Sequence, residues 1–237
     1  MPATVSMTNA IVAVRSLLDE ASAVYWSDTE LTTWINEGCL EVSRRAEILW
    51  NIDSISVTAL TQTYNCPADF LNGHRSQFTP TGSTITYPCE YRRYNAMDDE
   101  WGILPSLPAA WPRFWTMWEK TDGSTGLIQP YVMLYPSPGQ NGTLQLFYYR
   151  AAAAVTGTTN IDTQPGWQDI VYDYAIYRAR RKDRDPDWQA AKGIYEANLA
   201  EMMNRTRDLT DLADVMQTGN VGYPPLYAMG GESSDGW

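Results

Sequence analysis

The chain has 237 residues, of which 44% are hydrophobic, and its formal net charge is −11. This acidity argues against ordinary binding to the phosphate backbone of nucleic acids, which requires a basic surface, and no apolar run is long enough to predict a membrane span. The three cysteines, at positions 39, 66 and 89, are far apart and His74 is the one histidine, so we expect no disulfide framework, no metal and no cofactor.

Residues 1–50 are predicted to contain two helices, the first over residues 8–18. Ser27 and Glu30 have the spacing of a capping box, in which each side chain bonds the backbone amide of the other residue. They begin a long helix over residues 28–49. Its apolar residues fall on one side at the helical period, and they supply the first half of an expected core: Leu31, Trp34, Ile35 and Val42.

Residues 51–164 are predicted to be rich in β-structure. Apolar and polar residues alternate over 54–58, and β-favouring residues dominate 84–87, 131–135 and 142–149, which is typical of strands. Turn residues separate these stretches. We expect a small antiparallel sandwich or barrel, interrupted by one short helix around residues 95–101.

Helical periodicity returns after Pro165 and continues to about residue 213. One face of this region supplies the second half of the expected core: Trp167, Ile170, Val171 and Tyr174. Asp185 and Pro186 have the composition of a helix start. Residues 213–237 are rich in glycine and proline, and we expect an extended tail there.

The predicted fold class is α+β. Residues 1–50 and 165–212 form a helical bundle, because neither apolar stripe can be buried alone. The small antiparallel β domain of residues 51–164 is inserted into this bundle, and residues 213–237 form the extended tail.

Candidate catalytic groups are few. Asp98, Asp99 and Glu100 could act as acids in glycan hydrolysis, but adjacent carboxylates do not establish the separation that a glycosidase needs, and a solvated acidic turn is the simpler interpretation. His74 lies in a turn-like segment without a recognisable nucleophile motif. Four tryptophans could form a sugar-stacking platform, although packing within the β region is favoured: Trp101, Trp111, Trp115 and Trp118.

A basic run lies near residue 180 and includes Arg178, Arg181, Lys182 and Arg184. Nucleic-acid binding is one interpretation. Acidic residues interleave with the run, however, and cations are favourable at a helix C-terminus. We therefore favour a helix-end cluster that also contributes to contacts between subunits.

Three segments, in this order, resemble the head-to-tail adaptor (connector) proteins of tailed bacteriophages, including the tail tubular A type. The first is YWSDTELTTWINEG at residues 25–38, which is similar to the capped long helix of that family. The second is YNCPADFL at residues 64–71, where Cys66 replaces the usual aliphatic residue. The third combines LQLFYYR at residues 144–150 with YDYAIYRARRKD at residues 172–183.

The resemblance implies a structural protein without an active site. Such adaptors form a ring, usually twelve-fold, beneath the portal protein in the neck of the virion, after assembly in the host cytoplasm. The ring closes the filled head, extends the channel through which double-stranded DNA passes without sequence recognition, and docks the tail or nozzle protein. An extended C-terminal segment docks on the portal in many members, with expected anchors here at Tyr223, Pro224, Pro225, Leu226 and Tyr227.

Two alternatives remain open from the sequence. The first is a phage tail-associated glycan-binding or cell-wall hydrolase module that uses Asp98, Asp99 or Glu100. The second is a tail completion or neck protein of different symmetry, which the stoichiometry of its ring would distinguish from an adaptor.

Overall fold

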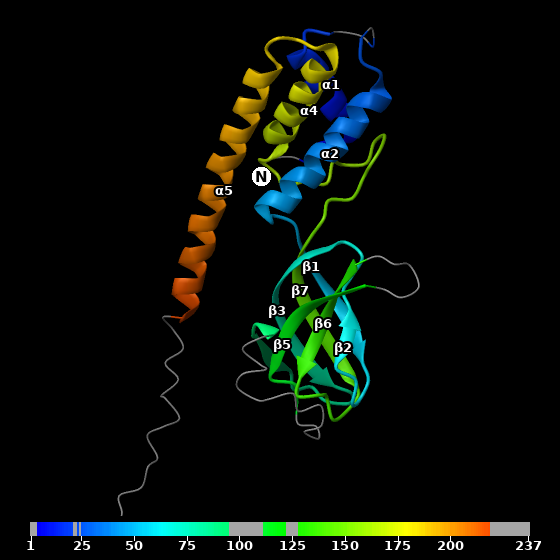
Figure 1. Cartoon of the computed structure of the whole chain (residues 1–237), viewed down its shortest axis with the longest axis vertical. Helices are drawn as coiled ribbons and strands as arrows, with labels where there is room; N and C mark the ends of the chain where they lie inside the picture. The colour runs from blue at the N-terminus through cyan, green and yellow to red at the C-terminus, as the bar shows by residue number, and fades with distance from the viewer. Residues whose placement is uncertain (1–3, 21–22, 24, 95–110, 122–127, 219–237) are drawn as a thin grey trace, which may run out of the picture. The chain divides into compact units, whose positions relative to one another are not determined.

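The computed structural model describes residues 4–20, 23, 25–94, 111–121 and 128–218 (Figure 1). The chain divides into two compact units, Met1–Tyr195 and Glu196–Trp237. In chain order the elements are α1 (Met7–Leu17), α2 (Asp28–Ala46), β1 (Trp50–Val57), β2 (Thr63–Asn65), β3 (Phe70–Pro80), β4 (Tyr87–Tyr91), β5 (Phe114–Thr121), β6 (Ile128–Tyr135), β7 (Gly142–Arg150), α4 (Gln168–Asp183) and α5 (Trp188–Thr218).

The predicted capping box at the start of α2 is confirmed. The Glu30 amide donates to Ser27 Oγ at 3.2 Å, and the Ser27 amide donates to Glu30 Oε2 at 3.0 Å. Two backbone donors that the first helical turn leaves free are thereby satisfied. The helix ends where Glu47 adopts a left-handed conformation, with φ of 49°, and the chain then enters β1.

Helices α1, α2 and α4 lie side by side (Figure 1). The apolar residues expected along α2 and α4 are all buried: Leu31, Trp34, Ile35, Val42, Trp167, Ile170, Val171 and Tyr174. The two helices approach closely at Gly38, where an added Cβ would lie 3.2 Å from Val171 Cγ1 and from Tyr174 Cδ1. A larger residue at this position would require the side chains of Val171 and Tyr174 to shift.

The seven strands form one sheet in the order β1-β7-β3-β4-β5-β6-β2, and in Figure 1 it curls until it is nearly closed. All neighbouring strands are antiparallel except β4 and β5, which are parallel. Side chains from all of these strands fill the interior: Val57, Tyr64, Phe70, Phe78, Cys89, Trp115, Val132, Leu134, Leu144, Leu146 and Tyr148.

The predicted fold class, a helical bundle with a small inserted antiparallel β domain, is wrong. The described residues form a mixed α/β structure in which four helices accompany a seven-stranded, nearly closed sheet. The β region was underestimated because two long strands were missed. Residues 71–76 resemble a turn in sequence but lie within β3, and the tryptophans at 115 and 118 lie within β5. The parallel pairing of β4 with β5 also departs from the expected antiparallel arrangement.

The segment between β7 and α4 is tied to the end of β7 and to α2 by polar contacts. Arg150 forms a two-pronged ion pair with Asp162, with distances of 2.6 and 2.7 Å. Asn36 donates to the carbonyl of Val155 and accepts from its amide, both at 3.0 Å. The bonds from Asn36 satisfy the backbone groups of Val155, and together with the ion pair they hold the chain in place where it returns from the sheet to the helices.

Trp115 is fully buried and its ring covers Gly73 of β3. A Cβ added at Gly73 would lie 2.8 Å from Trp115 Cζ3 and closer still to Cη2. Trp115 cannot move without displacing other core side chains, because interiors are close-packed. Glycine is therefore required at this point of β3.

Gly73→Ala is expected to destabilise the protein by about 1–3 kcal/mol, the usual cost of overpacking a core. The matched control is Gly193→Ala, because nothing lies within 4 Å of a Cβ added there in α5. Alanine is the better helix former by up to about 1 kcal/mol, so this variant should be as stable as the wild type or more so. Chemical denaturation measures both, and equal stability of the two variants would contradict the packing proposed for Trp115.

Candidate functional site

The side chains considered for catalysis do not form an active site in the described part of the chain. His74 is exposed on β3, where its ring lies 4.7 Å from the Trp50 ring and 6.3 Å from the Tyr149 ring. Asp98, Asp99 and Glu100 lie outside the described residues. No group of three or more His, Cys, Asp or Glu side chains within the described ranges is arranged to hold a metal ion.

The three cysteine thiols are poorly suited to nucleophilic chemistry. Burial raises the pKa of Cys39 and of Cys66 to about 12 and that of Cys89 to about 11. The thiolate is the reactive form, so all three remain protonated near neutral pH. These cysteines are packing residues.

The tryptophans do not share one platform. Trp115 is inside the sheet. Trp111 stacks on Tyr87 with ring centroids 5.0 Å apart, and the exposed Trp118 ring lies 4.5 Å from Tyr94, while Trp101 lies outside the described residues. This arrangement supports packing within the β region over a sugar-binding surface.

The predicted basic cluster lies at the C-terminal end of α4, beside α2. Arg178 pairs with Glu37 at 3.0 Å, and Lys182 pairs with Glu30. Arg181 lies over the Trp188 ring at 5.7 Å, while Arg184 is the exposed left-handed residue that ends the helix. Together with Trp34, the cations at 178, 181 and 182 line a pocket of about 380 Å³.

Lys182 joins the capping box of α2 to α4. A hydrogen bond from Lys182, followed by hydrogen bonds from Ser27, lowers the pKa of Glu30 from 4.5 to about 2. The Lys182 ammonium also lies 5.8 Å from the Trp26 ring and 6.0 Å from the Trp34 ring, which is within the range of cation–π attraction. This lysine therefore contributes to helix packing as well as to surface charge.

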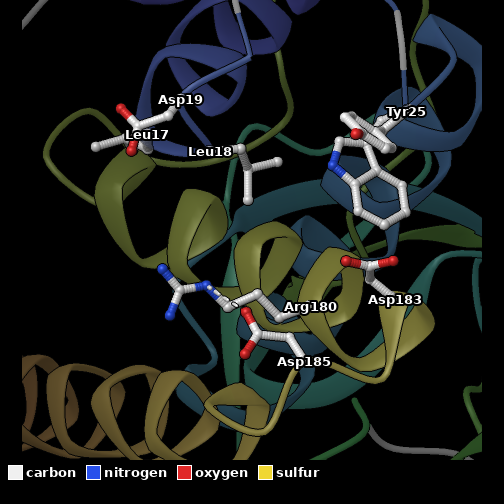
Figure 2. Close-up of a pocket in the computed structure, with 8 residues that line it drawn as sticks. Leu17, Leu18, Asp19, Tyr25, Arg180, Asp183 and Asp185 are labelled. Atoms are coloured by element: carbon white, nitrogen blue, oxygen red, sulfur yellow. Dashed lines mark ion pairs between the residues drawn. The ribbon is translucent and has the colours of Figure 1, made fainter.

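A second pocket, of about 260 Å³, lies between the end of α1 and the end of α4. Figure 2 shows Leu17, Leu18 and Asp19 on one side of it and Arg180 with Asp185 on the other, with Tyr25 and Asp183 beside them. Arg180 and Asp185 are 3.9 Å apart. Sequence reasoning missed this pocket, because its walls come from segments about 160 residues apart in the chain and no local pattern connects such segments.

The outer face of the sheet carries an exposed aromatic patch that sequence reasoning also missed. Trp50 and Ile52 of β1 are exposed, and the Trp50 ring lies 4.2 Å from Tyr149 of β7. The signal was present, since Trp50 and Ile52 have the two-residue spacing of one strand face. Large exposed apolar patches mark interaction surfaces.

The edge strand β1 is protected against pairing with another strand. The Ile52 amide donates to Asn51 Oδ1 and the Ser54 amide donates to Asp53 Oδ1, both at 2.9 Å. Occupied edge amides discourage strand addition.

Glu30→Gln is expected to lower the thermal midpoint of unfolding at pH 7, because it removes the charged partner of Lys182. The pKa of Glu30 is about 4.5 in the unfolded chain and about 2 in the folded protein. The charged carboxylate therefore stabilises the folded protein fully above pH 4.5, and this stabilisation is lost as the pH falls toward 2. The difference between variant and wild type should therefore shrink between pH 4.5 and pH 2. Thermal unfolding followed by circular dichroism at several pH values measures it, and a difference independent of pH would show that the charge of Glu30 has no role.

One comparison with known proteins identifies the family of this chain. Among the described residues, none of the helices combines the length and the apolarity that crossing a bilayer would require. No curated protein matches the chain. The family model described as SU10 adaptor protein matches residues 6–222, which is most of the sequence. The chain therefore belongs to the SU10 adaptor protein family, a family of phage head-to-tail adaptors.

Proposed function

We propose that this protein forms a ring beneath the portal of a tailed phage, with twelve copies as the expected number, as in adaptors of the tail tubular A type. The ring closes the DNA-filled head, extends the DNA channel and docks the tail or nozzle protein. The observation that carries the proposal is the family match over residues 6–222. The protein would occupy the neck of the virion after assembly in the host cytoplasm.

The separate surfaces of the chain support an adaptor role. An adaptor has to contact neighbouring copies and at least two other proteins. The first compact unit offers two pockets at the end of α4 and a distinct aromatic patch on the sheet. We assign the aromatic patch around Trp50 to the tail or nozzle protein, because exposed tryptophan and tyrosine are typical anchors of protein interfaces.

The charge of the chain suits a channel that must release DNA. Each copy contributes a net charge of −11, and walls of the same sign as the phosphate backbone bind it weakly. Two cations of the basic cluster, Arg178 and Lys182, are already paired with carboxylates of α2. We therefore propose that acidic side chains dominate the lumen and that DNA passes without sequence recognition.

Portal docking is assigned to the C-terminal segment, residues 213–237. Helix α5 continues to Thr218, and the remaining residues lie outside the described part of the chain. The expected anchors are the apolar residues of one short stretch: Tyr223, Pro224, Pro225, Leu226 and Tyr227.

Deleting residues 219–237 is expected to abolish binding to the purified portal of the same phage, because it removes these anchors and leaves α5 whole. The matched control deletes residues 228–237, keeps the anchors and should bind. Co-sedimentation with the portal measures binding, and circular dichroism confirms that both variants fold. Normal portal binding after the longer deletion would contradict this role for the tail.

A further inference from the structure

Two pockets lie on opposite sides of the last turns of α4. Arg178, Arg181 and Lys182 line the first pocket, together with Trp34 of α2. Arg180 and Asp183 line the second. These two residues follow Arg178 by two and five positions, and at 3.6 residues per turn that places them on the other side of the helix. The end of α4 therefore presents two different surfaces in roughly opposite directions.

The first surface, called here the basic face, consists of Trp34, Arg178, Arg181 and Lys182. Carboxylates of α2 pair with Arg178 and Lys182. Arg181 is exposed, and no carboxylate of the described residues lies within ion-pair distance of it. Its guanidinium group lies on the Trp188 ring, which leaves its charge open to an acidic partner.

The second surface, called here the acidic face, consists of Val12, Leu17, Asp19, Tyr25 and Asp183. Arg180 and Asp185 also line it, and they form an ion pair with each other at 3.9 Å. The apolar side chains in it are unusually open, since Val12 is 62%, Leu17 55% and Tyr25 77% exposed. Asp19 links two adjacent pockets of this surface. Asp19 and Asp183 are both exposed, and neither forms an ion pair within the part of the chain that the structure describes.

We propose that the acidic face of one copy binds the basic face of the next copy of this chain. The inference rests on the proposed ring, because a closed ring of more than two identical subunits joins two different surfaces of each copy, head to tail. The unpaired carboxylates of Asp19 and Asp183 then meet the unpaired guanidinium group of Arg181. Two acidic faces cannot associate with each other in the same way, because like charges repel.

The two kinds of side chain have different tasks in this contact. Tyr25, Leu17 and Val12 supply the apolar area that is removed from water, and this area provides most of the affinity. Exposed ion pairs contribute little affinity by themselves. They set the orientation of the copies and the rate at which the copies associate. Reversing a charge, however, creates repulsion in every contact of the ring.

The test uses two single variants, Arg181→Glu and Asp183→Arg, each mixed with the portal. Either change places like charges opposite each other, and we expect the assembled fraction in analytical ultracentrifugation to fall by about tenfold. An equimolar mixture of the two variants should restore assembly. In that mixture the unchanged acidic face of Arg181→Glu binds the unchanged basic face of Asp183→Arg. The two altered faces, one with Glu at 181 and the other with Arg at 183, again carry opposite charges.

The matched control is Lys120→Glu, which makes the same change of charge at an exposed position of β5, outside both faces. It should assemble like the wild type, and circular dichroism should show that all variants are folded. The inference is overturned if the single variants assemble normally or if their mixture does not restore assembly. The proposed function is unaffected by either result. Intact rings that fail to bind the portal would assign these faces to the portal instead. A wild-type chain that stays monomeric with its portal rejects the ring and this inference together.

Discussion

The close contact between α2 and α4 at Gly38 is the constraint on which the rest of the structure depends. The two helices come from distant parts of the sequence, and the chain builds the whole sheet between them. It leaves α2 at Glu47 and returns through β7, which pairs with β1 from Trp50 onward. The outgoing and returning segments therefore run side by side. The ion pair of Arg150 with Asp162 fastens the returning segment to the end of β7, and the hydrogen bonds of Asn36 with Val155 fasten it to α2. A residue larger than glycine at position 38 would require the side chains of Val171 and Tyr174 to shift.

The sequence predicted the helices better than the sheet, and the reason is physical. A capped amphipathic helix is specified by residues a few positions apart, and the box at Ser27 and the stripe of α2 were found in that way. Strand β3 was missed because Asn72, Gly73 and His74 favour turns when considered alone. They are held in a strand by pairing with β7 and by the Trp115 ring that covers Gly73. Both are long-range effects that no local window contains, and for this reason the size of the sheet and the fold class were mispredicted.

Of the two candidate surfaces at the end of α4, one could be predicted from the sequence and the other could not. The basic cluster is contiguous in sequence and was predicted, although the pairing of Lys182 with Glu30 and of Arg178 with Glu37 required the fold. The acidic face combines the end of α1 with the end of α4 and was invisible in the sequence. The family resemblance supplied the adaptor role, which the local chemistry of the described residues did not indicate. Buried aromatic contacts of this chain thus fix the positions of its exposed charged and apolar faces.

The proposed role of this chain depends on its assembly into a ring on the portal. Native mass spectrometry of the chain, alone and mixed with the portal of the same phage, tests it most directly, because the mass gives the number of copies without any assumption about shape. We expect a defined complex with about twelve copies of the chain per portal, joined head to tail. A chain that remains monomeric in both samples, or that binds the portal in variable numbers, would contradict it.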